Sequence, residues 1–213
     1  MMNKTKIEWT DFSWNPVTGC HHGCEYCYAR ALANRIGYGF GPRFWPNRLH
    51  DPLKIKRCSK IFVSSMGDLF GEWVPQEWIN AVLDIVRQAP RHSFQFLTKN
   101  PERLSSQEWR TNAWVGASAV TQAMADRAIV ALSNVRASVR FLSCEPLHEM
   151  IDLGDICLDW LIIGAQTGPA AFQPERKWVD RLLDFAAERH TPVFLKPNLR
   201  GYATRREFPP LAT

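Results

Sequence analysis

Residues 60–88, KIFVSSMGDLFGEWVPQEWINAVLDIVRQ, contain the pattern that decides the fold. The stretch begins with Ile61-Phe62-Val63, and such an unbroken apolar run is typical of a parallel strand that is buried on both faces. Pro75 suits the first turn of a helix. The apolar residues after it recur at helical spacing: Trp78, Val82, Ile85 and Val86. We therefore predict a strand, a polar connection and an amphipathic helix.

The same alternation recurs along the rest of the chain. Strands are predicted at Phe12–Thr18, Lys60–Ser65, Ser93–Thr98, Ala113–Ser118, Val139–Ser143, Leu158–Gly164 and Pro192–Lys196. Helices are predicted at Glu25–Ile36, Pro75–Gln88, Thr121–Val135 and Pro174–Arg189. This alternation indicates an α/β fold with a parallel sheet, either open or rolled into a barrel. Residues 37–52 fit neither period, and we expect them to form an irregular loop or lid in a single domain of residues 1–213.

Length and composition exclude several classes of protein. The 213 residues suit one domain, and the longest apolar runs are far shorter than the roughly 20 residues of a membrane helix. Six cysteines are too few for a small disulfide scaffold, and three of them lie within eight positions. We expect a cytoplasmic, reduced protein with a metal site and no membrane contact. The net charge of +5 suits a phosphate-bearing partner, although the basic residues are spread along the chain.

Polar residues end every predicted strand. In a parallel α/β fold, ligands bind at the C-terminal ends of the strands, so these residues are expected to meet at one edge. For any one of them, a turn residue that caps the next helix is an equally good interpretation. The polar ends are Thr18 and Cys20, Ser64 to Asp68, Thr98 to Asn100, Ser118, Ser143 to Glu145, Gln166 and Thr167, and Lys196 to Asn198.

The stretch Gly19-Cys20-His21-His22-Gly23-Cys24-Glu25-Tyr26-Cys27-Tyr28 places three thiols at C-x3-C-x2-C spacing. Soft thiolates so close in a loop suit an iron–sulfur cluster or zinc. A structural zinc ion needs a fourth ligand, for which His21 or His22 is available. Neighbouring His and Cys ligands are awkward in so short a loop, and no second C-x2-C pair exists in the chain.

This motif resembles the signature of the radical S-adenosylmethionine (radical SAM) superfamily, C-x3-C-x-aromatic-C after the first strand, with Tyr26 at the aromatic position. The resemblance implies a partial (β/α) barrel of six or seven parallel strands. It also implies a [4Fe-4S] cluster on Cys20, Cys24 and Cys27, with one iron open to S-adenosyl-L-methionine (SAM). One-electron reduction then releases a 5′-deoxyadenosyl radical, and the protein positions and shields the cofactor.

Three further stretches are similar to an uncharacterised, phage-associated family of radical SAM-like proteins: Trp14 to Cys20, Phe96 to Arg103 and Phe141 to Leu147. The likeness runs from Lys6 to about Lys196. That family often has Gly-Gly-Glu-Ser-Gly after the sixth strand, where this chain has Gly164-Ala165-Gln166-Thr167-Gly168. An amide therefore replaces a carboxylate, which puts any proton-transfer or cation-binding role of Gln166 in doubt.

The resemblance also assigns the polar strand ends. Ser65, Met66 and Gly67 are expected to bind the methionine moiety of SAM through the backbone, with Asp68 as the partner of its ammonium group. The alternative is a tight turn in which Asp68 caps a helix. Tyr26, Ser118 and Gln166 complete the expected cofactor-binding set. The expected catalytic residues are Lys99, Cys144 and Glu145. The alternatives are a salt bridge between Glu145 and Lys99 or Lys196, and a core position for Cys144. Trp45 is a candidate for stacking on a base.

The leading functional prediction is a radical SAM enzyme that acts on an unknown substrate, with a nucleobase or nucleic acid as the first choice. Its reductant is expected to be flavodoxin-like or ferredoxin-like. The alternative is a non-catalytic nucleic-acid-binding module whose cysteines hold a structural metal. A protein that keeps the cluster but has lost turnover is a third interpretation, which the Gln166 replacement favours.

Overall fold

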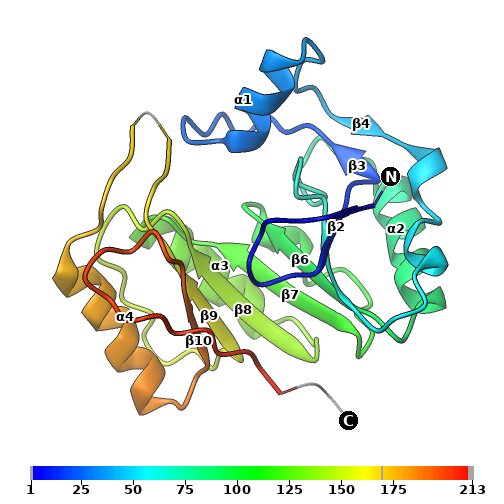
Figure 1. The fold of residues 1–213 in the computed structure, drawn as a ribbon. Coiled ribbons are helices and arrows are strands. Elements are labelled where there is room, and N and C mark those ends of the chain that lie inside the picture. The colour runs from blue at the N-terminus through cyan, green and yellow to red at the C-terminus, as the bar shows by residue number, and fades with distance from the viewer. Residues whose placement is uncertain (1, 169, 211–213) are drawn as a thin grey trace. The chain divides into compact units, whose positions relative to one another are not determined.

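The structure, a computed structural model, describes residues 2–168 and 170–210 and has a mostly parallel sheet of eight strands with helices (Figure 1). The strands pair in the order β1-β2-β5-β6-β7-β8-β9-β10, which follows the order of the chain. In this sheet β1 is antiparallel to β2, whereas the pairs β2–β5, β5–β6, β8–β9 and β9–β10 are parallel. The predicted α/β class with a mostly parallel sheet is therefore confirmed.

The strands of this sheet are β1 (Asn3–Lys4), β2 (Phe12–Trp14), β5 (Lys60–Val63), β6 (Ser93–Thr98), β7 (Ala113–Ser118), β8 (Val139–Cys144), β9 (Trp160–Ile163) and β10 (Val193–Leu195). A second sheet pairs β3 (Val17–Thr18) with β4 (Arg43–Phe44). The α-helices are α1 (Tyr28–Arg35), α2 (Gln76–Gln88), α3 (Gln122–Ser133) and α4 (Arg176–Glu188). Short 3₁₀ turns are η1 (Pro46–Arg48), η2 (Pro52–Lys54) and η3 (Pro101–Arg103).

The chain divides into two compact units. The first comprises Met1–Asn100 and Trp109–Trp114, and we call it the cysteine-loop unit because it contains the loop with Cys20, Cys24 and Cys27. The second, the C-terminal unit, comprises Pro101–Glu108 and Val115–Thr213. In the cysteine-loop unit, α2 buries Ile79, Val82, Leu83, Ile85 and Val86. Strands β2, β5 and β6 of this unit bury Trp14, Ile61 and Phe94 completely.

The C-terminal unit buries the apolar strands β8 and β9 in the same manner. Phe141, Trp160 and Ile162 are fully buried, and α4 contributes Val179, Leu182, Phe185 and Ala186 to the core. Helix α3 buries mainly alanines, which allow close packing: Ala125, Ala128 and Ala131 with Leu132. No helix in the part of the chain that the structure describes is long and apolar enough to cross a membrane.

Two predicted boundaries are wrong at the N-terminal end. The predicted strand Phe12–Thr18 is divided into β2 and β3, because Pro16 has no N–H to donate and the chain leaves the main sheet after Trp14. The predicted helix from Glu25 begins only at Tyr28, where the Cys27 sulfur accepts a hydrogen bond from the Arg30 N–H and caps the first turn. The cysteines therefore all precede the helix.

Candidate functional site

The three cysteines lie on the connection between β3 and α1, residues 19–27, which we call the cysteine loop. Gly19 opens the loop at a φ of +86° and forms an isolated parallel bridge with Gly67. A Cβ on Gly67 would come within 2.8 Å of the Gly19 carbonyl oxygen, and one on Gly19 would overlap the Gly41 carbonyl. Two glycines are therefore required where the loop crosses the connection after β5.

Backbone N–H groups already point at two of the thiols. The His22 N–H donates to the Cys20 Sγ, and the Arg30 N–H donates to the Cys27 Sγ, each at 3.4 Å. All three cysteines are partly buried. Burial raises the pKa of the Cys20 thiol to about 11, while the His22 N–H acts in the opposite direction. A bound cation would offset this desolvation, because metals bind the thiolate.

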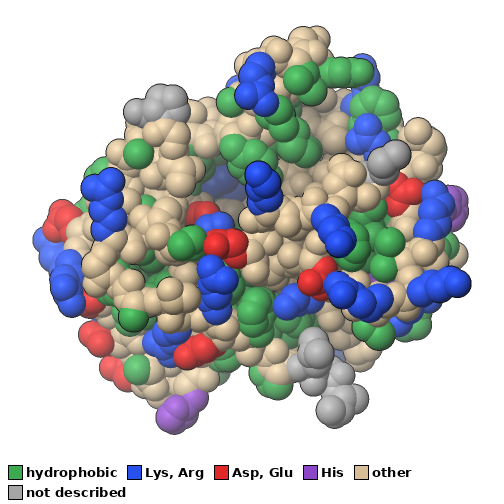
Figure 2. Space-filling view, in the orientation of Figure 1, with side chains coloured by type: hydrophobic (Ala, Val, Ile, Leu, Met, Phe, Trp, Pro, Cys, Tyr) green, Lys and Arg blue, Asp and Glu red, His purple; other side chains and the backbone are tan. Residues whose placement is uncertain are grey.

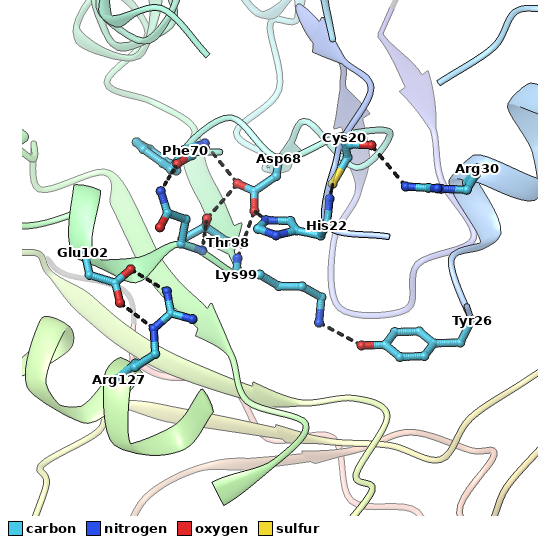
Figure 3. Close-up of polar contacts among 11 residues, drawn as sticks. Cys20, His22, Tyr26, Arg30, Asp68, Phe70, Thr98, Lys99, Glu102 and Arg127 are labelled. Atoms are coloured by element: carbon cyan, nitrogen blue, oxygen red, sulfur yellow. Dashed lines mark hydrogen bonds and ion pairs between the residues drawn. The ribbon is translucent and has the colours of Figure 1, made fainter. Parts of the chain in front are cut away.

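The Asp68 carboxylate attaches the cysteine loop to the ends of β5 and β6 (Figure 3). Its Oδ2 lies 2.7 Å from the His22 Nε2 and accepts the Lys99 N–H at 2.9 Å. Its Oδ1 accepts the Thr98 hydroxyl at 2.7 Å and the Phe70 N–H at 3.0 Å. Asp68 is only 4% exposed, so a buried carboxylate with four partners holds three segments together.

The Asn15 side chain fixes the turn after β5 through hydrogen bonds. The Asn15 Oδ1 accepts hydrogen bonds from the Met66 N–H at 2.8 Å and the Ser65 hydroxyl at 3.2 Å. The Ser65 carbonyl accepts the Tyr28 hydroxyl at 2.8 Å, and the Met66 carbonyl accepts the Gly19 N–H at 2.8 Å. The backbone of the predicted SAM-binding turn is therefore hydrogen-bonded to Gly19, at the start of the cysteine loop, and to Tyr28, the first residue of α1.

Lys99 reaches the cysteine loop through its side chain. Its Nζ donates to the Tyr26 hydroxyl at 2.9 Å and lies 5.4 Å from the centre of the Tyr26 ring. Burial lowers the pKa of Lys99 below its usual value, and Cys24, Asp68, Cys20 and Cys27 all act in the opposite direction. Burial likewise raises the pKa of Tyr26. The Lys99 ammonium therefore lies in the electrostatic environment of all three thiols.

The three thiols of the loop are the ligand type of iron–sulfur clusters and of zinc sites. The His22 Nε2 contacts Asp68, and metal-ligating histidines commonly make such a contact through the ring nitrogen that does not bind the metal. Among residues 2–168 and 170–210, no group of three or more His, Cys, Asp and Glu side chains is arranged to hold a metal ion. The loop therefore has the ligand types for a cluster without a formed set of ligands.

The remaining predicted residues belong to the C-terminal unit, at the ends of its strands. Ser118 is buried at the end of β7, and Cys144 is completely buried, which raises the pKa of its thiol to about 12. The Lys196 Nζ lies 3.3 Å from the Glu145 Oε1, and a Cβ on Gly164 would crowd both side chains. Glu145 thus pairs with Lys196 in this structure, as one sequence interpretation anticipated.

Gln166 lies in a hairpin of the same unit. Its Oε1 is 2.7 Å from the His148 Nε2, and its Nε2 donates to the Ala170 carbonyl at 2.6 Å. Its backbone pairs with Phe172. His148 and Asn15 were not predicted as site residues, and Thr98 was predicted only as one of the polar strand ends. Asn15 is the one with a local signal, since an Asn before Pro16 reads as a turn residue that bonds to nearby backbone.

Comparison with known proteins identifies the family. A model of the DUF5131 family, described as a protein of unknown function, matches residues 4–205, and the chain belongs to that family. No curated protein matches the sequence. The fold is similar to that of spore photoproduct lyase complexed with dinucleoside spore photoproduct, with a TM-score of 0.62 and 10% identity. A point mutant of that lyase gives a TM-score of 0.66 at 10% identity. Each match covers 92% of this chain and 78% of the lyase.

Proposed function

We propose that this chain is a radical SAM enzyme whose [4Fe-4S] cluster is held by Cys20, Cys24 and Cys27. The observation that carries the proposal is the anchoring of the cysteine loop, by the Gly19–Gly67 bridge and by His22 on the buried Asp68. Such anchoring holds three thiols on one loop beside a turn with backbone groups for a ligand. The fold likeness to spore photoproduct lyase supports the same class.

When bound, the cluster and SAM together supply a 5′-deoxyadenosyl radical after one-electron reduction by a flavodoxin-like or ferredoxin-like donor. The residues of this chain would bind and orient the cluster and SAM. We assign the Ser65–Gly67 backbone and Tyr26 to SAM. Asp68 holds the loop through His22, and Lys99 supplies a positive charge near the thiols.

The residues of the C-terminal unit are assigned to the cofactor and the substrate. Ser118 and Gln166 are proposed to bind the cofactor. Glu145 with Lys196 forms an ion pair that can accept or donate a proton or bind a polar substrate group. Cys144 is proposed as the hydrogen-atom donor, although its thiol is buried in the state described. These assignments remain predictions.

A nucleobase within a nucleic acid is the proposed substrate. The net charge of +5 suits a polyanion. The lyase with the similar fold was solved with a dinucleoside photoproduct, which supports a nucleic-acid-related substrate here.

The test is anaerobic purification and cluster reconstitution, followed by dithionite reduction with SAM and chromatographic assay for 5′-deoxyadenosine. The Cys24→Ala variant should lose the product. The matched control is Cys58→Ala, because Cys58 is an exposed cysteine of the same unit outside the loop. Brown protein with iron and sulfide is expected for the parent and the control.

Other outcomes separate the alternatives. Stoichiometric zinc without iron would contradict the proposal and favour a structural metal in a binding module. A full cluster that yields no 5′-deoxyadenosine with chemical reductant would favour a protein that has lost turnover. Equal loss of product in Cys24→Ala and Cys58→Ala would contradict the assignment of the cysteine loop as the cluster-binding segment.

A further inference from the structure

One segment of the chain has a marked local excess of positive charge. Residues 43–60, which we call the basic strap, contain one acidic residue, Asp51, and six basic ones: Arg43, Arg48, Lys54, Lys56, Arg57 and Lys60. The whole chain has 26 Lys and Arg against 21 Asp and Glu, so the rest of it contains 20 of each. The net charge of +5 is therefore that of the strap alone.

The basic strap is attached to the residues that lead into the cysteine loop. Its strand β4 pairs with β3, so that Arg43 lies opposite Thr18, two residues before Cys20. The Trp45 N–H donates to the Pro16 carbonyl at 2.8 Å, and the Trp14 indole N–H donates to the Arg48 carbonyl at 2.8 Å. The strap and the cysteine loop are thus built on the same short strand.

Trp45 orients two cations of the strap. The Arg48 guanidinium lies 4.1 Å from the centre of the Trp45 ring, and that of Arg43 lies 5.1 Å from it. The Trp45 indole N–H donates to the Thr18 hydroxyl at 2.9 Å, which fixes the ring. Guanidinium groups already lie over this ring, so the ring can orient donors for phosphate oxygens.

The end of the strap presents charge to solvent. Lys56 and Arg57 are exposed. No large apolar side chain is strongly exposed among residues 43–60, all of which the structure describes. Figure 2 shows blue Lys and Arg side chains along the right side of the molecule, where the cyan segment of Figure 1 runs. A membrane-binding surface combines cations with apolar side chains that insert, so this surface fits a nucleic acid better.

We propose that the basic strap binds the phosphate backbone of the nucleic-acid strand that carries the substrate base. The inference rests on the proposed function, since it assigns a polymer rather than a free nucleoside to the same site. Arg43 and Arg48 contact phosphates next to the cysteine loop, and Lys56 with Arg57 extends the contact along the strand. These contacts position the strand without reading its sequence.

The test is fluorescence anisotropy with short fluorescein-labelled DNA and RNA oligonucleotides of one sequence, over about 50 to 200 mM salt. Lys56→Gln/Arg57→Gln is compared with Arg176→Gln/Lys177→Gln, which removes the same charge from exposed positions of α4. The strap variant should bind about tenfold or more weakly, and its salt slope should fall by about 2, roughly 1 for each phosphate contact. The α4 variant should bind like the parent.

Arg43→Gln provides a second variant, expected to lower the slope by about 1. Equal weakening by the strap and α4 variants would overturn the inference, and so would binding to phosphatidylserine vesicles without binding to either oligonucleotide. Titrating the parent, whose 5′-deoxyadenosine formation is assayed separately, separates the two proposals. Strap-dependent binding by a parent that makes no 5′-deoxyadenosine would leave nucleic-acid binding by the strap standing while the proposed function fails.

Discussion

The strand ends of the two units hold their polar side chains in different ways. In the cysteine-loop unit, the buried Asp68 binds two backbone N–H groups, a hydroxyl and a ring. In the C-terminal unit, partly exposed side chains pair with each other, as in Glu145 with Lys196 and Gln166 with His148. Backbone-anchored groups cannot change without moving the chain, whereas side-chain pairs can. The first arrangement suits a fixed cofactor site, and the second suits recognition that differs between relatives.

The largest effect is expected from Gly19→Ala. The methyl group would overlap the Gly41 carbonyl at a φ of +86°, so the free energy of unfolding in urea should fall by more than about 3 kcal/mol. Gly154→Ala is the control, because Gly154 has a φ of +55° with nothing within 4 Å of its Cβ position. It should lose only about 1 kcal/mol. Equal losses would mean that the close approach of the backbones is unimportant.

Asp68→Asn should have the next largest effect, about 2 kcal/mol by urea unfolding. The amide NH₂ cannot accept the hydrogen bonds that one carboxylate oxygen receives, and a buried donor would lose its partner. Cluster retention after desalting should fall as well, because a neutral amide holds the His22 ring less strongly than a carboxylate does. Asp155→Asn, at an exposed carboxylate, should match the parent in both measurements. An Asp68→Asn protein that keeps its full stability and its cluster would show that the hydrogen bonds of Asp68 do not fix the site in the cysteine-loop unit.

Glu145→Gln should cost less than about 1 kcal/mol, because a partly exposed ion pair at 3.3 Å contributes little. A double-mutant cycle with Lys196→Gln measures the coupling directly. A coupling above about 2 kcal/mol would show that the C-terminal pair is as rigid as the Asp68 network. If the ion pair contacts the substrate, Glu145→Gln should lower catalytic activity strongly while it changes the free energy of unfolding only slightly.

The smallest effect on stability, within about 0.5 kcal/mol, is expected from Gln166→Glu. The carboxylate keeps an acceptor for the His148 ring, and only the hydrogen bond to the Ala170 carbonyl is lost. The informative readout is therefore 5′-deoxyadenosine formation. A clear gain would mean that the missing carboxylate limits turnover in this chain, while an unchanged rate would mean that the amide is compatible with activity.

Much of the fold could be predicted from local sequence. The predicted strands Ser93–Thr98 and Ala113–Ser118 agree with β6 and β7 at both ends. Apolar runs and helical spacing depend on neighbours in the chain, which is why they are readable. Helix α2 buries Ile79, whereas Trp78 is half-buried and stacks on Phe44 of the strap. The other predicted residues of this face, Val82, Ile85 and Val86, are buried as expected.

Residues 37–52 were harder to predict. They contain β4 and η1, and the pairing partner of β4 is β3, about 26 residues earlier in the chain. Such short strands are stabilised by distant backbone groups and by clamps such as the Trp45 indole on Thr18. No periodicity within the segment indicates that partner.

The sequence by itself determined the α/β class, the three thiols at C-x3-C-x2-C spacing and the charge of the basic strap, because each depends on residue type and local order. The association with phage stays a prediction. Only the tertiary structure decided that His22 contacts Asp68, that Asn15 holds the turn after β5, and that Glu145 pairs with Lys196. Hydrogen bonds and ion pairs between distant residues depend on how the strands are placed in space, and spacing along the chain does not encode that placement.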